Sequence, residues 1–526
     1  MHGLPRAPNH FFLIFSLLTL LLVLIADMSP LSRSAAAGFI LGVFQLVQPA
    51  AGADVDVSWY APSSRNVNNL TEAVDGQGTY GFIFDTSKTP DKLYGTYNWC
   101  NMPHVRKREY PRAARGYELR YVELIQRHHK RTPYSSNAFP VEPYTWDCDD
   151  ALLHYYGEPV HGQSAARAYR QGTISSINPF VPSGWIGSCQ FPQITAEGLD
   201  DSWVHGKDLY AVYGEMLGFL PRKGDKNLGE KVKYRATNNL ITHQVAGMVI
   251  NGMWDTTDDF PLLVQAANVD SLEPQYPCST GSSIFSNIKS SNNPAWKKHL
   301  DLSANLFSTL DAISGVSPSD GGFHASFDHY YDNLSARQCH AGKPLPCKVN
   351  ATGPCVTQDL ANAVYRMGQW EYSQMYRDSP NSLAASVSSY GVWVAELAAH
   401  LRDVVAGKTK TLYFHNVAHD GSISRVLSIL QFDEMVWPGM GSEIVFELYE
   451  NKGVPPPPHG TPAPAHHPRR PESKGKFYVR VLFGGKILKS SSPTLGVMDM
   501  VPVETLLAYL DALVGENASK VQAKCN

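Results

Sequence analysis

The sequence contains two short clusters of residues whose types suit the transfer of an anionic group. The first is Arg127-His128-His129-Lys130-Arg131-Thr132-Pro133, in which five consecutive side chains are cationic or titratable. The second is Ala418-His419-Asp420-Gly421-Ser422, which adds a histidine and a carboxylate. Arginine presents a planar fork of donors that matches phosphate geometry, and histidine can accept a phosphoryl group as a covalent intermediate. The two clusters together predict a site for phosphoryl transfer.

Each cluster taken alone has a plainer interpretation. The basic run is then a solvated surface turn, and the His419-Asp420 pair is the N-cap of a helix beside a structural histidine. Their positions favour the chemical interpretation. The first cluster directly follows a predicted strand, at the strand end where open α/β sheets bind ligands. The second precedes a predicted helix, whose first N–H groups attract anions, so both clusters are expected at one edge of the same sheet.

The elements that must position these clusters are predicted from periodicity. Tyr117 to Gln126 is rich in β-branched and aromatic residues and reads as the first strand of the core sheet. A helix is expected from Gly198 to Leu217, where apolar residues recur every three or four positions and Thr195 can act as N-cap. Lys231 to Thr237 reads as a strand and Thr242 to Met253 as the next helix. This alternation favours a parallel sheet with covering helices.

The C-terminal part repeats the pattern. The further predicted elements are strands at Thr411 to Val417, Glu443 to Tyr449 and Phe477 to Phe483, and helices at Ser422 to Phe432 and Val503 to Val514. Residues 255–405 show few strand-like runs and predict a largely helical inserted domain. The expected division is therefore a targeting segment (1–53), an irregular N-terminal extension (54–115), two parts of one α/β domain (116–254 and 406–526), the helical domain between them, and a Pro-rich surface insert (453–475).

Length and composition bound the class of protein. A chain of 526 residues exceeds what one hydrophobic core usually supports, so two domains are expected. Hydrophobic residues make up 43% and charged residues 18%, which is an ordinary globular composition. The formal net charge of -3 provides no overall basic field, so it argues against nucleic-acid binding through neutralised phosphates. Any anion site must be local.

The N-terminus reads as a targeting segment. The apolar stretch from Phe11 to Ala26 is too short to be a typical membrane-spanning helix. A second stretch, Ala35 to Val47, ends in the small-residue pattern Ala51-Gly52-Ala53 and follows Met28. Export is predicted, either from a start at Met28 or by processing after Ala53, with the protein secreted or placed in a cell wall. Anchorage in a membrane by the first apolar stretch is the alternative.

The cysteines and glycosylation motifs agree with export. The eight cysteines form an even set without a Cys-x-x-Cys pair, which predicts disulfides. The sequence does not determine which cysteines pair with one another. They are Cys100, Cys148, Cys189, Cys278, Cys339, Cys347, Cys355 and Cys525. Four Asn-x-Ser/Thr motifs predict N-glycans at Asn69, Asn333, Asn350 and Asn517.

The two clusters resemble the histidine acid phosphatase family, which is marked by R-H-G-x-R-x-P after its first strand and by H-D at a later strand-to-helix junction. Further segments that resemble the family are Ile194 to Leu199, Arg235-Ala236-Thr237, Ser442 to Leu448 and Tyr478 to Leu482. The resemblance implies a phosphoglycerate-mutase-like α/β fold with a smaller helical domain, a small phosphorylated substrate, and no metal or organic cofactor.

The resemblance also implies a role for each residue of the motifs. His128 would be the nucleophile that becomes phosphohistidine. Arg127, Arg131 and His419 would hold the phosphoryl oxygens, and Asp420 would donate a proton to the leaving group. A neutral nucleophilic histidine beside such an acid is expected to work best at mildly acidic pH.

Two residues depart from the family pattern. His129 replaces the glycine of the first motif, where the backbone is expected to approach the phosphate closely. Ile241 stands before Thr242, where the family places a third phosphate-clamping arginine. Losing such a clamp could cost several orders of magnitude in rate. Arg235, Lys130 and His243 are the candidate substitutes.

Three functions are therefore compared. The first is an acid phosphomonoesterase acting on a phosphorylated sugar, an inositol phosphate or another small ester. The second is a catalytically weak or inactive relative that keeps the fold as an extracellular binding or cell-wall protein. The third is a metal-dependent hydrolase that uses histidines such as His415 and His419. This hypothesis is ranked lowest, because a strand does not bring residues four positions apart to one metal ion as a helix does.

Overall fold

The structure is a computed structural model that describes residues 55–79, 99–140, 145–155, 168–175, 177–348, 353–453 and 476–525. The predicted targeting segment, Asn350 and nearly all of the Pro-rich insert lie outside these residues, as does part of the N-terminal extension. The chain divides into the units Met1–Val55 and Asp56–Asn526, and the whole central sheet belongs to the second unit.

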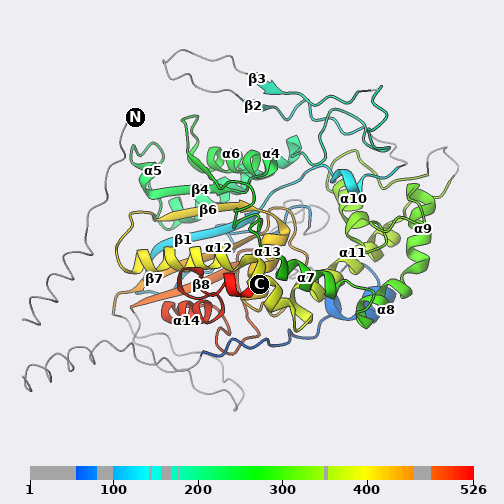
Figure 1. Cartoon of the computed structure of the whole chain (residues 1–526). Coiled ribbons are helices and arrows are strands. Elements are labelled where there is room, and N and C mark those ends of the chain that lie inside the picture. Colours follow the sequence, from blue (N-terminus) through cyan, green and yellow to red (C-terminus); the bar gives the residue numbers. More distant parts are fainter. Residues whose placement is uncertain are drawn as a thin grey trace, which may run out of the picture. The chain divides into compact units, whose positions relative to one another are not determined.

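A mixed sheet of eight strands forms the centre of this unit (Figure 1). The strand order is β10-β8-β7-β1-β6-β4-β5, and β9 pairs with β8. The strands are β1 (Tyr117–Arg127), β4 (Val232–Ala236), β5 (Leu262–Val264), β6 (Tyr413–Ala418), β7 (Glu443–Asn451), β8 (Phe477–Phe483), β9 (Lys486–Ile487) and β10 (Val501–Pro502). A separate two-stranded sheet pairs β2 (Leu153–Tyr155) with β3 (Ala168–Arg170).

The prediction of a parallel sheet is correct for one half only. β1, β6, β4 and β5 run parallel, whereas β7 is antiparallel to β1 and to β8, and β8 is antiparallel to β9 and β10. The alternation of strand and helix that predicts parallel pairing holds along the first half of the chain. The predicted strands that became β7 and β8 follow each other without an expected helix between them, and antiparallel neighbours need no crossover helix.

Helices cover both faces of the sheet (Figure 1). α4 (Ala196–Tyr210) and α6 (Leu240–Trp254) lie over one face, and α12 (Ser382–Val405), α13 (Asp420–Ile429) and α14 (Val503–Val514) over the other. A Cβ atom on Gly206 would meet the Val249 carbonyl oxygen at 2.3 Å, and one on Gly252 would meet that of Trp203 at 2.1 Å. The two glycines therefore permit the close approach of α4 to α6.

A cluster of further helices lies beside the sheet (Figure 1). It contains α7 (Ser279–Ile288), α8 (Pro294–Leu302), α9 (Ala304–Ser314), α10 (Asp328–Gln338) and α11 (Gln358–Ser373). Buried aromatic residues, among them Trp296, Phe307 and Trp370, give most of this cluster its own apolar core. These helices agree with the predicted α/β fold and its helical part. The limits predicted for the helical domain, residues 255 and 405, remain a prediction. The same range also contains β5, which belongs to the central sheet, and α12, which covers the sheet.

Most predicted elements are confirmed. β8 and α14 have the predicted bounds, and β1 and α6 differ from them by no more than two residues. The predicted N-cap of α4 is also confirmed, since the Thr195 side chain accepts a hydrogen bond from the Gly198 N–H at 3.3 Å. The N-terminal extension has the short helix α3 (Leu70–Asp75) in its described part, and the four-residue α5 (Leu228–Lys231) precedes β4.

The eight cysteines form four disulfides: Cys100–Cys339, Cys148–Cys189, Cys278–Cys525 and Cys347–Cys355. The first joins the segment before β1 to the end of α10, and the third joins the start of α7 to the C-terminus. Among the residues that the structure describes, no helix combines the length and apolarity that a membrane crossing requires.

The predicted glycan acceptors differ in exposure. Asn69 and Asn517 are exposed. Asn333 is fully buried in α10, where its amide donates to the Asn137 carbonyl at 2.9 Å and accepts from Arg337 at 2.8 Å. A glycan on Asn333 would require these contacts to break, so the prediction is wrong for this residue. The short motif carries no information about burial.

Candidate active site

The two sequence clusters lie at the same end of neighbouring parallel strands. The β1–β6 register pairs Arg127 with Ala418, and the His128 N–H donates to the Ala418 carbonyl at 3.0 Å. His128 and His419 therefore follow adjacent strand ends, and their ring centroids are 5.4 Å apart. The structure thus brings together the clusters that the sequence separates by almost three hundred residues.

The His128 ring is buried and held in one orientation. Its Nδ1 lies 2.9 Å from the backbone carbonyl of His129. A carbonyl oxygen only accepts hydrogen bonds, so Nδ1 carries the proton and Nε2 keeps its lone pair. Burial lowers the pKa of His128 well below the usual histidine range, and the charges of Arg127 and Arg131 lower it further. The ring is therefore neutral and nucleophilic at mildly acidic pH.

Arg127 joins the end of β1 to the acidic residue of the second cluster. Its guanidinium lies 3.2 Å from Asp420 and 4.7 Å from the centroid of the Trp99 ring, and it donates to the Pro438 carbonyl. The side chain is fully buried, and its Nε–H has no hydrogen-bond partner among the described residues. A buried guanidinium with a spare donor suits an anionic ligand.

Arg131 provides the second arginine of the cluster. It forms an ion pair with Asp332 at 3.0 Å, donates to the Thr132 carbonyl, and stacks over the Tyr134 ring at 4.2 Å. Only 4% of its surface is exposed, and its Nε–H also lacks a partner within the described part of the chain. Asp332, on α10, therefore connects this arginine to the helical cluster.

Asp420 is surrounded by donors. Its Oδ2 accepts from the Trp437 indole at 2.7 Å and from the Tyr372 hydroxyl at 3.2 Å, and its Oδ1 from the Gly421 N–H at 2.8 Å. Burial alone would raise the pKa of Asp420, but the charge of Arg127 and the indole hydrogen bond lower it to about 2. Asp420 is thus ionised in this arrangement and would need a change of local charge to act as an acid.

His419 contacts a carboxylate that the sequence motifs do not include. Its Nε2 lies 2.9 Å from Oε2 of Glu273 and 3.0 Å from the Thr237 hydroxyl. Burial would raise the pKa of Glu273, but the hydrogen bond and charge of His419 lower it overall. Glu273 is therefore an anion at the nitrogen that was expected to hold a phosphoryl oxygen.

The position of the absent third arginine is not on the wall of the site. Ile241, at the start of α6, is 1% exposed and belongs to the apolar core between α6 and the sheet. Lys130 points towards α4, where it pairs with Asp201 at 3.0 Å and Glu197 at 3.8 Å. His243 hydrogen-bonds the Thr237 carbonyl at 2.9 Å. Of the predicted substitutes, only His243 contacts a residue that touches His419.

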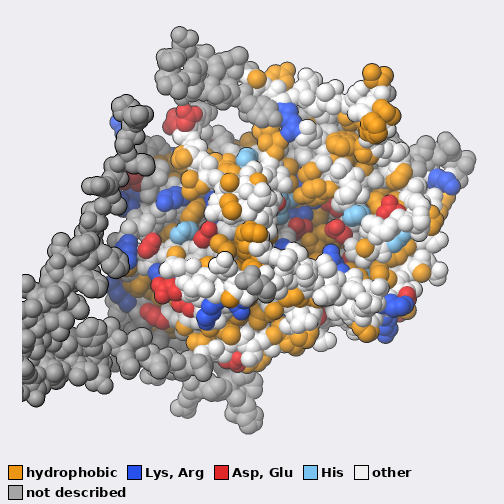
Figure 2. Space-filling model, in the orientation of Figure 1, with side chains coloured by type: hydrophobic (Ala, Val, Ile, Leu, Met, Phe, Trp, Pro, Cys, Tyr) orange, Lys and Arg blue, Asp and Glu red, His pale blue; other side chains and the backbone are white. Residues whose placement is uncertain are grey.

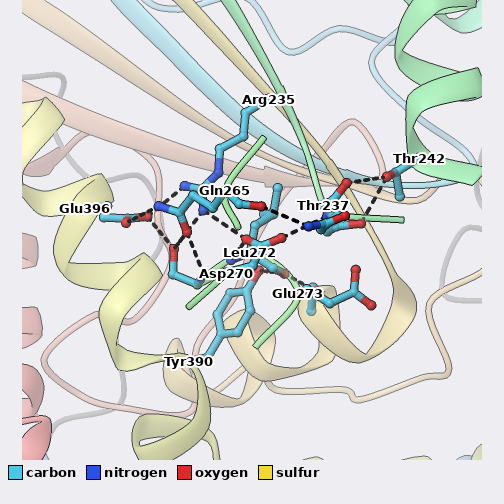
Figure 3. A network of polar contacts seen from close by, with 12 residues as sticks. Arg235, Thr237, Thr242, Gln265, Asp270, Leu272, Glu273, Tyr390 and Glu396 are labelled. Atoms are coloured by element: carbon cyan, nitrogen blue, oxygen red, sulfur yellow. Dashed lines mark hydrogen bonds and ion pairs between the residues drawn. The ribbon is translucent and has the colours of Figure 1, made fainter. Parts of the chain in front are cut away.

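Arg235 is engaged in a separate polar network (Figure 3). It pairs with Glu396 at 2.8 Å and Asp270 at 3.3 Å, and donates to the Ser271 hydroxyl at 2.8 Å. Figure 3 shows Glu396 and Asp270 beside the guanidinium, with Thr237 on the other side of the network. Two carboxylates already neutralise the charge of Arg235, which argues against a role as the substitute clamp, and that role stays a prediction.

His129 does not line the site as a bulky replacement for glycine. Its ring is fully buried and its Nε2 lies 3.1 Å from Nδ1 of His205, whose Nε2 contacts Glu443 at 3.0 Å. A Cβ atom on Gly441 would come within 2.3 Å of the His129 ring, so that glycine makes room for it. The His129 side chain is therefore packed inside the protein, against His205 and Gly441.

The metal alternative gains no support from the two histidines it named. His415 is buried, with Nε2 bonded to Gln126 and Nδ1 to Tyr413. His419 has different partners, as described above. Among the described residues, no group of three or more metal-ligating side chains is found.

Several residues of the site carried no sequence signal. Glu273 and Asp332 stand in no recognisable motif, and Trp99, Tyr372 and Trp437 are aromatic residues like many others in the chain. They reach the site because loops and helices distant in sequence converge on the strand ends.

The surface charge is mixed on the face that Figure 2 shows. Positive and negative side chains are interspersed there, so this face carries no broad electrostatic field of one sign.

Comparisons with known proteins give similar folds only. No family model matches the chain. No curated protein matches it either. Among solved structures, it is similar to Hafnia alvei phytase in complex with myo-inositol hexakis sulphate, at 14% identity and a TM-score of 0.47, over 77% of this chain and 99% of that one.

Two more solved structures are similar. The phytase from D. castellii is 12% identical, with a TM-score of 0.43, over 86% of this chain and 93% of that one. The Bifidobacterium longum multiple inositol polyphosphate phosphatase is 11% identical, with a TM-score of 0.42, over 74% and 92%. These three TM-scores are below 0.5, so the chemistry of this chain has to follow from its own residues.

Proposed function

We propose that the chain is an acid phosphomonoesterase that works through a phosphohistidine at His128. One observation carries the proposal: the buried, neutral His128 ring donates its Nδ1–H to a backbone carbonyl and keeps the Nε2 lone pair. Arg127 and Arg131 flank it in sequence, and His419 lies beside it in space. This is the arrangement that nucleophilic attack on a phosphoryl group requires.

In the first half-reaction, Nε2 of His128 attacks phosphorus and the P–O bond to the alcohol breaks. The leaving oxygen takes a proton from Asp420. In the second half-reaction, a water attacks phosphorus and gives its proton to Asp420, while the P–N bond breaks and returns the electron pair to His128. Inorganic phosphate leaves, and both side chains regain their starting states.

Asp420 would hold this proton only when substrate is bound. In the unliganded arrangement the charge of Arg127 keeps its pKa at about 2. A phosphoryl group between the two arginines adds negative charge next to Asp420, which raises its pKa. We therefore infer that substrate binding itself prepares the acid.

The proposal includes export and a small phosphorylated substrate. Four disulfides suit an oxidising compartment, and Asn69 and Asn517 are exposed acceptors for glycans. The identity of the alcohol is left open.

The direct test is secretion of the chain from Asp54 onward and assay of p-nitrophenyl phosphate hydrolysis between about pH 4 and 7, with a chelator present. We expect metal-independent turnover that falls by at least about four orders of magnitude in His128→Ala. His400→Ala is the matched control, because His400 lies on α12 and contacts Glu123 of β1 rather than the residues of the site. Retained activity in His128→Ala would refute the mechanism.

A second candidate function is favoured by Glu273 and Ile241. A site with two arginines and an added carboxylate could bind a phosphorylated ligand without turning it over. In that case the wild-type protein binds inorganic phosphate, loses binding in Arg127→Ala, and hydrolyses neither p-nitrophenyl phosphate nor an alkyl phosphate.

A further inference from the structure

The contact between His419 and Glu273 limits what His419 can hold. A ring nitrogen carries at most one hydrogen, and the Nε2–H of His419 is shared between Glu273 at 2.9 Å and Thr237 at 3.0 Å. The Glu273 side chain is 17% exposed, so it is not sealed in the core. Any phosphoryl oxygen that approaches Nε2 therefore comes within reach of a carboxylate oxygen.

The surroundings of Glu273 supply no second cation in direct contact. Among the described residues, its only ion pair is with His419. Two other titratable groups interact with the pair: His128, whose ring centroid lies 5.4 Å from that of His419, and Tyr134, which interacts with the charge of Glu273. Arg127, Arg131, Asp332 and Asp420 act on those two groups in turn, and His243 reaches only the Thr237 carbonyl. Arg235 is neutralised by Asp270 and Glu396, and Ile241 contributes no charge.

We propose that Glu273 selects a protonated phosphoryl oxygen, so that the site binds phosphomonoesters as monoanions. The inference rests on the proposed function of this site and deepens it. An ionised oxygen at His419 would face the Glu273 carboxylate, and two like charges that close together are strongly disfavoured. A P–OH group in the same place donates a hydrogen bond to that carboxylate. No covalent bond changes in this recognition step.

Two features of the chain act in the same direction. A third arginine would favour the dianion, and this chain has a buried isoleucine there. A carboxylate stands at His419 instead, and it stays ionised at mildly acidic pH because His419 lowers its pKa overall. The second pKa of a phosphomonoester is about 6. The monoanion therefore prevails in the acidic range where His128 and the rest of the site are expected to work.

Sulfate provides the decisive probe, because it has the shape of phosphate but carries no proton at these pH values. We would measure the binding of inorganic phosphate and of sulfate to the secreted chain by calorimetry at about pH 5. A site that hydrogen-bonds a ligand OH strongly rejects the analogue that lacks it. We expect wild-type protein to prefer phosphate by at least about a hundredfold, and Glu273→Gln to prefer it by less than about tenfold.

The control is Glu230→Gln, which removes an exposed carboxylate that pairs with Lys410 outside the site and should leave the preference unchanged. A second arm raises the pH to about 8.5, where inorganic phosphate is almost wholly the dianion. Wild-type affinity should then fall, and the affinity of Glu273→Gln should fall much less.

Three outcomes would overturn the inference. Wild-type protein could bind sulfate as tightly as phosphate, or bind neither anion. Glu273→Gln could weaken both anions by the same factor, which would mean that Glu273 only orients His419. Because the readout is binding, an inactive protein that still discriminates phosphate from sulfate would contradict the proposed hydrolysis and leave this inference intact.

Discussion

The two sides of the candidate site are built on different electrostatic principles. On one side, at the ends of β1 and β6, two buried arginines stand beside His128 and share their charge with Asp420 and Asp332. On the other side, at the end of β4 and in the loop that carries Glu273, the side chains are the Thr237 hydroxyl and the Glu273 carboxylate, while Ile241 is buried in the apolar core and adds no charge. We refer to these as the arginine side and the glutamate side.

The difference teaches that one site can attract an anion and still restrict its protonation state. The arginine side provides net attraction and lowers the pKa values of His128 and Asp420. The glutamate side adds negative charge at His419. If this division is correct, changes on the arginine side should abolish chemistry, and changes on the glutamate side should alter stability or ligand choice.

After the loss of the nucleophile itself in His128→Ala, the largest effect is expected for Asp420→Asn with a poor leaving group. An alkyl alcohol needs a proton to leave, so its phosphate should be hydrolysed about 10⁴-fold more slowly. The p-nitrophenolate ion leaves unprotonated, so its ester should lose far less. The comparison of kcat for the two esters is the measurement. Asp433→Asn, which loses an ion pair to Lys489 away from the site, is the control, and equal losses for both esters would show that Asp420 only holds Arg127.

The next effect is on Arg127→Ala, which we expect to lower kcat/KM by about 10³-fold. The charge of Arg127 helps to keep the pKa of His128 low. A histidine is the nucleophile only above its pKa, so raising that pKa moves the acid limb of the rate profile to higher pH. Arg127→Lys keeps the positive charge, so the pH of the acid limb should change little, whereas kcat/KM should still fall. An unchanged acid limb in Arg127→Ala would contradict this electrostatic role.

Ile241→Arg tests whether the glutamate side can be converted into a second arginine side. The sequence suggests a simple gain of a phosphate clamp. The structure instead predicts a loss of about 3 kcal/mol or more in the free energy of unfolding, because a guanidinium would enter an apolar core without a partner. Denaturant unfolding measures the loss, with Ile241→Leu as the control. A stable Ile241→Arg protein with raised activity would show that this position does reach the site.

The arginine side was predictable from sequence because it is local. Arg127, His128 and Arg131 follow one strongly patterned strand, and His419-Asp420 follows another. The rule that ligands bind at the carboxyl ends of parallel strands then brings the two together. Helices α6 and α14 were equally predictable from the sequence, because their apolar periodicity and their flanking residues indicate where they begin and end.

The glutamate side was not predictable, because its members meet only through tertiary packing. Glu273 lies in a loop without periodicity, and nothing in its neighbours indicates that it reaches His419. The inward direction of Ile241 depends on how α6 is rotated against the sheet. The mixed sheet was missed for a similar reason, since strand direction at the β7 edge is decided by pairing between distant segments. The burial of Asn333 likewise follows from the packing of α10.

The smallest effect is expected for His129→Gly, which introduces the glycine of the motif that the sequence resembles at a position where the structure has a cluster of histidines. Removing the buried ring leaves a cavity and takes away the partner of Nδ1 of His205, at a cost of about 2 kcal/mol in the free energy of unfolding at neutral pH.

The cost of His129→Gly should also depend on pH. Burial lowers the pKa of His129 well below its usual range. Below about pH 6.5 the unfolded chain therefore binds more protons than the folded chain, and stability falls as the pH falls. The variant lacks this histidine, so its deficit relative to wild type should shrink between pH values of about 7 and 5. Thermal melts at both pH values measure this change. A deficit that grows on acidification would mean that His129 carries a proton in the folded protein, and its contact with His205 would then need a different assignment of hydrogens.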